Sequence, residues 1–210
     1  LRLQQGRTAE QADGRRWHDQ GATEAQELGA ALAEAVQHLR ALEHFNDVQL
    51  VRAVGITLAA SQEMFMTLAK FRAMRLLWAR VLEASGLPAA ELTLHAETSW
   101  RMLAVMDPHS NILRATAAVF GAGLGGASSI CVLPFPLAQG LPNGFARRVA
   151  RNVQSILCEE SNLWRVADPA SGSGYVEQMT RDMCEVAWRV FQKTERSEWP
   201  RGDASATRSL

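Results

Sequence analysis

The sequence predicts an α/β fold made of consecutive βαβ units with a parallel sheet. Segments rich in β-branched residues alternate with longer segments in which Ala and Leu recur at helical spacing. No linker and no internal repeat divides the 210 residues, so one core is expected. About four β/α units can be counted, which matches half of an eight-stranded barrel or a small open sheet.

The N-terminal part of the chain begins with residues 1–14, which are polar and are expected to be a lead-in to a domain at residues 15–198. A short first strand is predicted around residues 15–18. Residues 22–45 carry Ala and Leu at three-and-four spacing, which predicts an amphipathic helix. Thr23, with Gln26 three residues later, is typical of the capping box that starts a helix.

The next unit is predicted as a strand at residues 48–60, because this segment is rich in β-branched residues. A helix is expected over residues 61–85, with Ser61 as its N-cap. Gly86 and Pro88 follow directly and are typical of a helix end.

The alternation continues to the end of the domain. We predict strands at residues 90–100 and 128–135, the second short and buried, and helices at residues 111–123, 145–161 and 175–195. Residues 199–210 are polar and are expected to be a disordered tail.

Composition excludes several classes of protein. The 22 basic residues balance the 22 acidic ones, so no global field would recruit nucleic acid or an anionic membrane. The three cysteines form no CxxC pair, which favours free thiols in a reducing compartment. There is no signal-peptide pattern and no apolar run of about 20 residues, so we expect a cytoplasmic protein without a membrane span.

Residues 121–126 (GAGLGG) satisfy the spacing of a dinucleotide-binding motif, G-x-G-x-x-G. Such a site needs the glycines after a strand and at the start of a helix. Here a helix precedes the glycines and a strand follows them, so the segment is interpreted as a helix C-cap with a tight loop.

Residues 107–112 (DPHSNI) come close to D-x-H-x-x-G, the motif that supplies a histidine ligand in one class of cobalamin-binding domains. The last position is Ile112 instead of glycine, and His109 has no partner that suggests a metal site. We interpret the segment as a turn, with Ser110 or Asn111 as the N-cap of the next helix.

The candidate site lies in HAETSW, residues 95–100. His95 and Glu97 are two residues apart on a predicted strand, so both side chains point to one face, near the carboxyl end where parallel α/β folds bind ligands. A carboxylate beside a histidine can hold its tautomer and raise its pKa. The spacing alone fits an acid–base pair and a buried structural pair equally well.

The helix over residues 61–85 carries both apolar and basic side chains at helical spacing. The apolar ones are expected in the core: Met64, Phe65, Leu68, Phe71 and Leu76. The basic ones are expected on a solvated face, from which one could reach a phosphate: Lys70, Arg72 and Arg75.

Several segments together resemble the methylmalonyl-CoA mutase family, in its order and spacing from about residue 17 to residue 195. They are residues 64–81, 95–100, 107–116, 141–162 and 166–177. The segments HAETSWRM (residues 95–102) and VLPF (residues 132–135) are most similar to the small subunit of the heterodimeric enzymes.

The resemblance implies a (β/α)8 TIM-barrel domain, of which this chain holds the C-terminal half, about four β/α units, and a closing helix. In that family the barrel threads the CoA chain along its axis, and a separate C-terminal domain carries adenosylcobalamin. The cofactor is therefore expected on a partner, a cobalamin-binding large subunit, and none on this chain. A half barrel would expose two sheet edges and an apolar face, so pairing with that subunit or self-association is expected.

The resemblance also bears on the site residues. Catalytic members place a histidine before a G-A-T-like segment, where it hydrogen-bonds the substrate thioester, and His18 is the nearest match. They carry glutamine where this chain has Glu97, and an arginine where it has Thr93. An ionised glutamate cannot donate a hydrogen bond to a carbonyl, and it adds negative charge against an anionic substrate.

We therefore expect a small-subunit-type component of an adenosylcobalamin-dependent isomerase, itself non-catalytic, with His18, His95 and Glu97 as candidate substrate-binding residues. Of these, His18 and Glu97 are the candidates for catalysis. Two alternatives remain open: an active isomerase subunit in which these residues line a working CoA pocket, and a stand-alone acyl-CoA-binding module.

Overall fold

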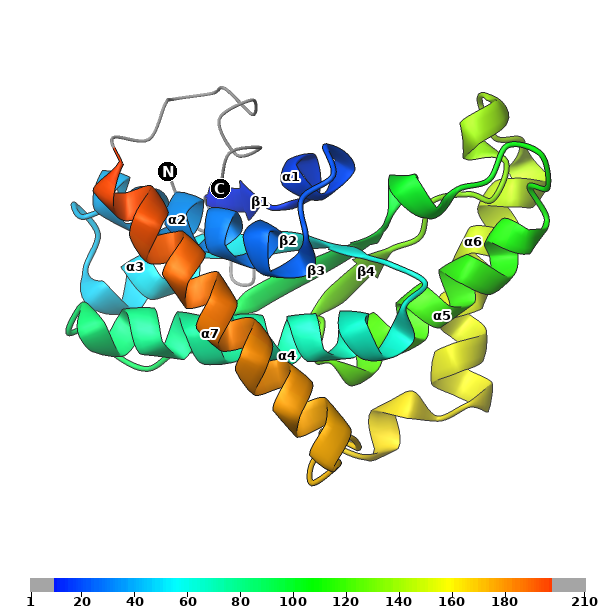
Figure 1. The fold of residues 1–210 in the computed structure, drawn as a ribbon. Coiled ribbons are helices and arrows are strands. Elements are labelled where there is room, and N and C mark those ends of the chain that lie inside the picture. Colours follow the sequence, from blue (N-terminus) through cyan, green and yellow to red (C-terminus); the bar gives the residue numbers. More distant parts are fainter. Residues whose placement is uncertain (1–9, 198–210) are drawn as a thin grey trace.

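The computed structural model describes residues 10–197, and they form a four-stranded parallel sheet covered by helices (Figure 1). The strands are β1 (Glu10–Asp13), β2 (Val54–Ala60), β3 (Thr93–Thr98) and β4 (Ser129–Cys131). They lie in chain order, each parallel to the next. This order is that of a β/α barrel, and the chain holds about half of one.

Within the described residues, seven α-helices connect and cover the strands. They are α1 (Arg15–Asp19), α2 (Glu24–Ala41), α3 (Asp47–Ala53), α4 (Met64–Ala84), α5 (Ser110–Leu124), α6 (Gly144–Ser155) and α7 (Gly174–Arg196). Short helical turns follow β3, β4 and α6, at Trp100–Met102, Leu137–Gln139, Ile156–Glu160 and Leu163–Arg165. The closing helix α7 crosses over α2 and α4 as an outer layer (Figure 1).

The main core lies between the sheet and the helices. Alternate strand residues point into it because side chains of a strand alternate between its two faces. The strand residues of this core include Ala12, Ile56, Leu58, Leu94 and Ala96, and those of the helices include Leu28, Leu32, Phe71 and Met74.

The opposite face of the sheet, which we call the barrel face, is lined by polar and small side chains. It carries Gln11, Asp13, Thr57, His95, Glu97, Ser129 and Cys131, which share a face by their register. Gln11 Nε2 donates a hydrogen bond to Thr57 Oγ1 at 2.8 Å. The apolar exposed face expected of a half barrel is therefore wrong for the described strands: this face is built for water or a polar ligand.

Two predicted strand positions differ from the structure. The first strand is β1, inside the predicted lead-in, and residues 15–18 belong to α1 instead. The first half of the predicted strand at residues 48–60 is the helix α3. Asn46 Oδ1 accepts a hydrogen bond from Gln49 N at 3.0 Å, and this cap starts the helix despite the β-branched residues.

The helix starts were predicted with mixed success. Thr23 caps α2 with Gln26 in the reciprocal bonds of a capping box, as predicted. Ser61 is not the N-cap of α4, because this helix begins at Met64. The backbone N–H of Ser61 instead donates a hydrogen bond to Thr67 Oγ1. Neither Ser110 nor Asn111 is the N-cap of α5, because Ser110 is already its first helical residue.

The glycine-rich segment ends α5, as predicted. Gly126 has a φ of +87°, which ends the helix in the left-handed region. A Cβ on Gly121 would lie 2.7 Å from the carbonyl oxygen of Met64, so this glycine also lets α5 approach α4 closely.

The last strand and the apolar side of α4 are more exposed than predicted. Ser129 and Cys131 are exposed because β4 is the sheet edge and pairs only with β3. On α4, Leu68 and Phe71 are buried as predicted, but Phe65 is 49% and Leu76 57% exposed. A helix turns 100° per residue, and this places the side chains of Phe65 and Leu76 outside the face of α4 that packs against the core.

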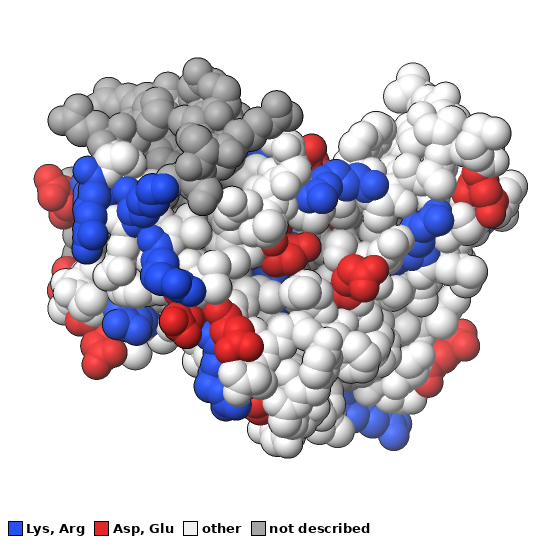
Figure 2. Space-filling model, in the orientation of Figure 1, with Lys and Arg blue, Asp and Glu red and all other residues white. Residues whose placement is uncertain are grey.

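The surface carries both signs of charge. On the face shown in Figure 2, acidic and basic side chains are interspersed, without an extended patch of one sign. None of the helices in residues 10–197 is long and apolar enough to cross a membrane. The predicted tail, residues 199–210, lies outside the described residues.

Candidate functional site

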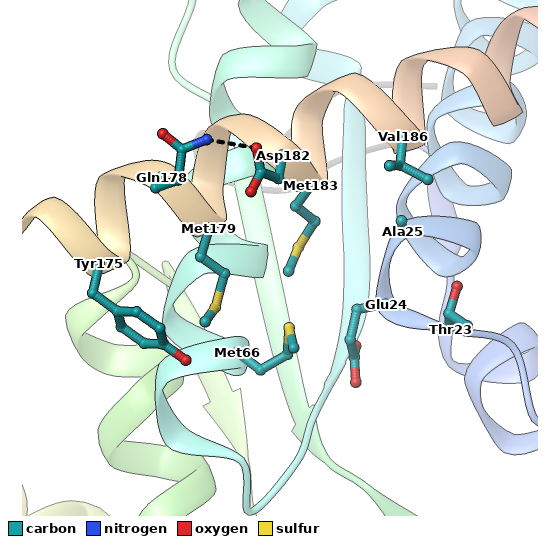
Figure 3. Close-up of a pocket in the computed structure, with 10 residues that line it drawn as sticks. All are labelled: Thr23, Glu24, Ala25, Met66, Tyr175, Gln178, Met179, Asp182, Met183 and Val186. Atoms are coloured by element: carbon teal, nitrogen blue, oxygen red, sulfur yellow. Dashed lines mark hydrogen bonds between the residues drawn. The ribbon is translucent and has the colours of Figure 1, made fainter.

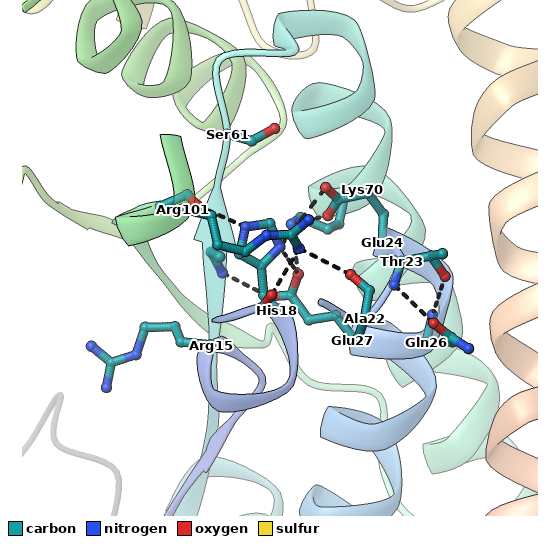
Figure 4. Close-up of polar contacts among 12 residues, drawn as sticks. Arg15, His18, Ala22, Thr23, Glu24, Gln26, Glu27, Ser61, Lys70 and Arg101 are labelled. Atoms are coloured by element: carbon teal, nitrogen blue, oxygen red, sulfur yellow. Dashed lines mark hydrogen bonds and ion pairs between the residues drawn. The ribbon is translucent and has the colours of Figure 1, made fainter. Parts of the chain in front are cut away.

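His18 lies at the carboxyl end of the sheet, buried to 3% exposure. It is carried by α1, which follows β1 after Gly14 alone. Its Nε2 lies 2.7 Å from Ser99 Oγ, just beyond β3, and its Nδ1 lies 3.3 Å from Glu27 Oε2 (Figure 4). Both ring nitrogens are thus directed at groups of this chain.

Glu27 and Lys70 complete the surroundings of His18. Glu27 Oε1 accepts the Ala59 N–H of β2 at 2.7 Å, and its Oε2 lies 2.8 Å from Lys70 Nζ. Lys70 also forms an ion pair with Glu24. We call this set the core network: His18, Glu24, Glu27, Lys70 and Ser99.

The charges of the core network sustain one another. Burial would raise the pKa of Glu27, but the charge of Lys70 and contacts with His18 hold it below its ordinary value. Burial would lower the pKa of Lys70, but Glu27 and Glu24 raise it. The predicted solvated position of Lys70 is therefore wrong: its side chain is 0% exposed, because α2 packs against this part of α4.

The three acidic and imidazole side chains of the core network could in principle ligate a metal. Ligand atoms of His18, Glu24 and Glu27 lie within 4.8 Å of one another. The Lys70 ammonium lies between the two carboxylates and already supplies the positive charge that a metal would bring. The two carboxylates are therefore satisfied by their ion pairs with Lys70, while His18 Nδ1 lies 3.3 Å from Glu27 Oε2.

A second charged set lies on the barrel face, and we call it the barrel-face network: Asp13, Arg15 and Glu97. The Arg15 guanidinium holds Asp13 through two hydrogen bonds, from Nε at 2.9 Å and from Nη2 at 2.7 Å. Its Nη1 lies 2.7 Å from Glu97 Oε1. Arg15 thereby links the ends of β1 and β3, and in Figure 4 its side chain points away from the core network.

The barrel-face network shifts the pKa values of its neighbours. Burial would raise the pKa of Asp13, but hydrogen bonds from Arg15 and its charge lower it overall. Burial and the charge of Arg15 lower the pKa of His95, which favours the neutral imidazole. Burial and the charge of Glu97 raise the pKa of Cys131, so this thiol stays protonated.

His95 and Glu97 share the barrel face, as their spacing predicts. His95 Nδ1 lies 2.8 Å from Ser129 Oγ on β4, while Glu97 is held by Arg15. Each therefore has its own partner, and no hydrogen bond or ion pair joins the two within residues 10–197. His18 belongs to the core network, so the three predicted site residues do not converge on one point.

Comparison with known proteins gives the family. The sequence profile of methylmalonyl-CoA mutase matches residues 11–198. The chain belongs to the methylmalonyl-CoA mutase family. It is 49% identical to the methylmalonyl-CoA mutase small subunit of Streptomyces virginiae and 41% identical to that of Propionibacterium freudenreichii subsp. shermanii. These matches cover 92% and 86% of this chain but only 31% and 29% of those proteins.

A relative named methylmalonyl-CoA mutase, from Rhizobium meliloti, is 37% identical over 83% of this chain and 25% of its own length. The chain thus spans about a third or less of the mutases that it matches. The two small subunits above exceed this relative in identity, in agreement with the resemblance of residues 95–102, whereas the small subunit of Porphyromonas gingivalis, at 36%, does not.

Mutases of this family depend on cobalamin, and the described residues of this member do not fit its histidine ligand. His109 lies at the start of α5, where its ring stacks on Phe135 with a centroid distance of 5.1 Å. Asn111 ties the preceding loop to Phe135 O at 2.9 Å and to Ala104. These contacts hold the segment at the start of α5, and the absence of a cobalamin ligand in it stays a prediction from the sequence.

A groove of about 550 Å³ lies among the helices of this mutase domain, and Glu24 of the core network stands at one side of it (Figure 3). It lies between the starts of α2 and α4 and the α7 helix. Its centre is formed by Met66, Tyr175, Met179 and Met183. The lining is mostly apolar and offers no paired acid and base.

Five residues of the two networks were missed in the sequence analysis: Asp13, Arg15, Glu24, Glu27 and Ser99. The capping box at Thr23 was a usable signal for Glu27, because a defined helix start fixes which side of α2 faces the sheet. Arg15 follows a strand that was placed too late in the sequence. Ser99 gave no signal beyond its place in HAETSW.

Proposed function

We propose that this chain forms half of the substrate barrel of a cobalamin-dependent methylmalonyl-CoA mutase, as a small-subunit-type component that does not itself catalyse. Its role is to complete and support an assembly with a larger, cobalamin-carrying subunit. Membership in the family and the similarity to small subunits support this role.

The observation that carries the proposal is the position of His18. Its Nε2 and Nδ1 are directed at Ser99 and Glu27, and the residue is 3% exposed. A group that binds a substrate carbonyl must present a donor within hydrogen-bond reach of it. His18 contributes instead to the packing of α1 against the sheet end.

The barrel face supports the same role. Glu97 and Asp13 give it two carboxylates against the single guanidinium of Arg15, so this set has a net negative charge. Methylmalonyl-CoA is itself an anion, and like charges disfavour its binding here.

Adenosylcobalamin is assigned by this proposal to the partner subunit. The small-subunit names of the relatives imply a larger subunit, and His109 is engaged with Phe135 in this chain. The contact between the subunits would include the edges of the half barrel, because β1 and β4 each present one unpaired strand edge within the described sheet.

An alternative is that the chain binds acyl-CoA, alone or as an active subunit. The polar barrel face, with the neutral His95 beside Ser129, supports this alternative because such groups suit a polar pantetheine chain.

Calorimetry of the purified chain with methylmalonyl-CoA separates the two. The supporting role predicts no measurable binding, together with co-purification of the chain with a cobalamin-carrying protein when both are expressed. Tight binding that is lost in His95→Ala would instead establish the acyl-CoA-binding function and reject the supporting one.

A further inference from the structure

The Arg15 side chain faces the barrel side of the sheet at its carboxyl end, and two carboxylates hold the three nitrogens of its guanidinium. Asp13 takes Nε and Nη2, and Glu97 takes Nη1. The Arg15 side chain is 33% and the Glu97 side chain 25% exposed, so solvent reaches the pair. A ligand in the barrel could therefore reach it as well.

The two carboxylates hold Arg15 in different ways. Asp13 lies two residues before Arg15 and also accepts its backbone N–H at 3.0 Å, so it positions the guanidinium. Glu97 comes from β3 and touches only the outer nitrogen Nη1. Its carboxylate stands where the carboxylate of a bound molecule would meet an arginine.

We infer that Arg15 is a carboxylate-binding residue whose ligand position is filled from within by Glu97. The ligand class is a small carboxylate, such as the free carboxylate of an acyl thioester. This inference rests on the proposed function and deepens it, because it identifies the group that closes the barrel face to its family's substrate.

The other charged side chains near Arg15 also fail to attract an anion to it. Asp19 on α1 lies close enough to interact with both Arg15 and Glu97, and burial raises its pKa. Arg16 is engaged with Glu34 at 2.8 Å. Arg101, which follows β3, donates from Nη1 to the carbonyl oxygens of His18 and Ala22. Neutralising Glu97 is the change that would let an incoming anion reach Arg15.

The test is a titration with malonate, measured by calorimetry for every variant. In the variants that keep Arg15, NMR at its side-chain Nε–H signal shows whether the anion binds there. Glu97→Gln keeps the shape and removes the negative charge that competes with an anion for Nη1, and its amide NH2 can donate to the anion. We expect it to bind malonate on the order of tenfold more tightly than the wild-type chain, from the lost repulsion at close range.

Asp13→Asn is the matched control, because it removes the same charge and leaves Glu97 on Nη1. It should gain much less than Glu97→Gln, and Arg15→Gln in the Glu97→Gln background should lose the gain. Glu43→Gln, at an exposed site on the helix side, controls for net charge and should leave binding unchanged. Thermal unfolding of each variant checks that it folds.

Two results would overturn the inference: equal malonate affinity of Glu97→Gln and the wild-type chain, or equal gains in Glu97→Gln and Asp13→Asn. Either leaves the supporting role intact, provided that the wild-type chain still co-purifies with a cobalamin-carrying protein. The supporting role fails separately, if the wild-type chain already binds methylmalonyl-CoA tightly.

Discussion

The core network and the barrel-face network lie at the same end of the sheet and use the same chemistry, two carboxylates around one cation. They differ in solvent access. The Glu27 and Lys70 side chains are 0% exposed, whereas those of Glu97 and Arg15 are 25% and 33% exposed. This difference in burial determines whether the ion pairs of a network are fixed or can be exchanged for water or a ligand.

In the core network, Glu27 and Lys70 depend on each other because water reaches neither side chain. His18, Glu27 and Lys70 therefore hold α1, α2 and α4 in one arrangement at the sheet end. In the barrel-face network, water can solvate either partner after separation, so the pair is weak and exchangeable. The first network suits a scaffold, and the second suits a site that a ligand or a substitution can change.

The largest expected effect comes from Lys70→Met, which keeps the length of the side chain and removes the cation. It leaves Glu27 buried without its main counter-charge, and we expect a loss of about 3–5 kcal/mol in the free energy of unfolding. Urea unfolding followed by circular dichroism measures it.

The control for Lys70→Met is the double variant with Glu27→Gln, which removes the stranded charge and should recover part of the stability. A loss below about 1 kcal/mol in the single variant would show that Lys70 and Glu27 do not form the buried pair described here.

The second largest expected effect is a loss of folding stability at acid pH, caused by protonation of Glu27 in the core network. The pKa of Glu27 is lowered in the folded state, so its contribution to stability is fully present above the ordinary value of 4.5. It is lost as the pH falls through the folded pKa, because the folded state must then take up a proton that the unfolded state already binds.

Urea midpoints measured between about pH 7 and pH 3 test this, with Glu27→Gln as the comparison. The wild-type chain should lose stability faster than the variant below about pH 4.5. Parallel curves would contradict a lowered pKa of Glu27.

The contrast between the networks also explains what the sequence could and could not reveal. The α/β order, the α2 capping box and the end of α5 depend on local patterns, and all were predicted. The shared face of His95 and Glu97 follows from the two-residue period of a strand, so it was predicted as well.

The partners of the site residues are far apart in the sequence, and local patterns do not contain them. His18 meets Ser99 across 81 positions, and Lys70 meets Glu27 across 43. Lys70 looked solvated because a lysine on a helix usually is; only the packing of α2 against α4 buries it. Misplacing β1 by a few residues concealed Arg15 and thereby the counter-ion of Glu97.

The smallest expected effect is the direct counterpart of the first. Arg15→Met removes the cation of the barrel-face network as Lys70→Met removes that of the core network. Asp13 and Glu97 remain partly exposed, so water solvates them and the free energy of unfolding should fall by no more than about 1 kcal/mol. The same urea unfolding measures it. A loss as large as that of Lys70→Met would mean that Arg15 holds β1 to β3 structurally, and the barrel-face network would then be a second scaffold element instead of an exchangeable site.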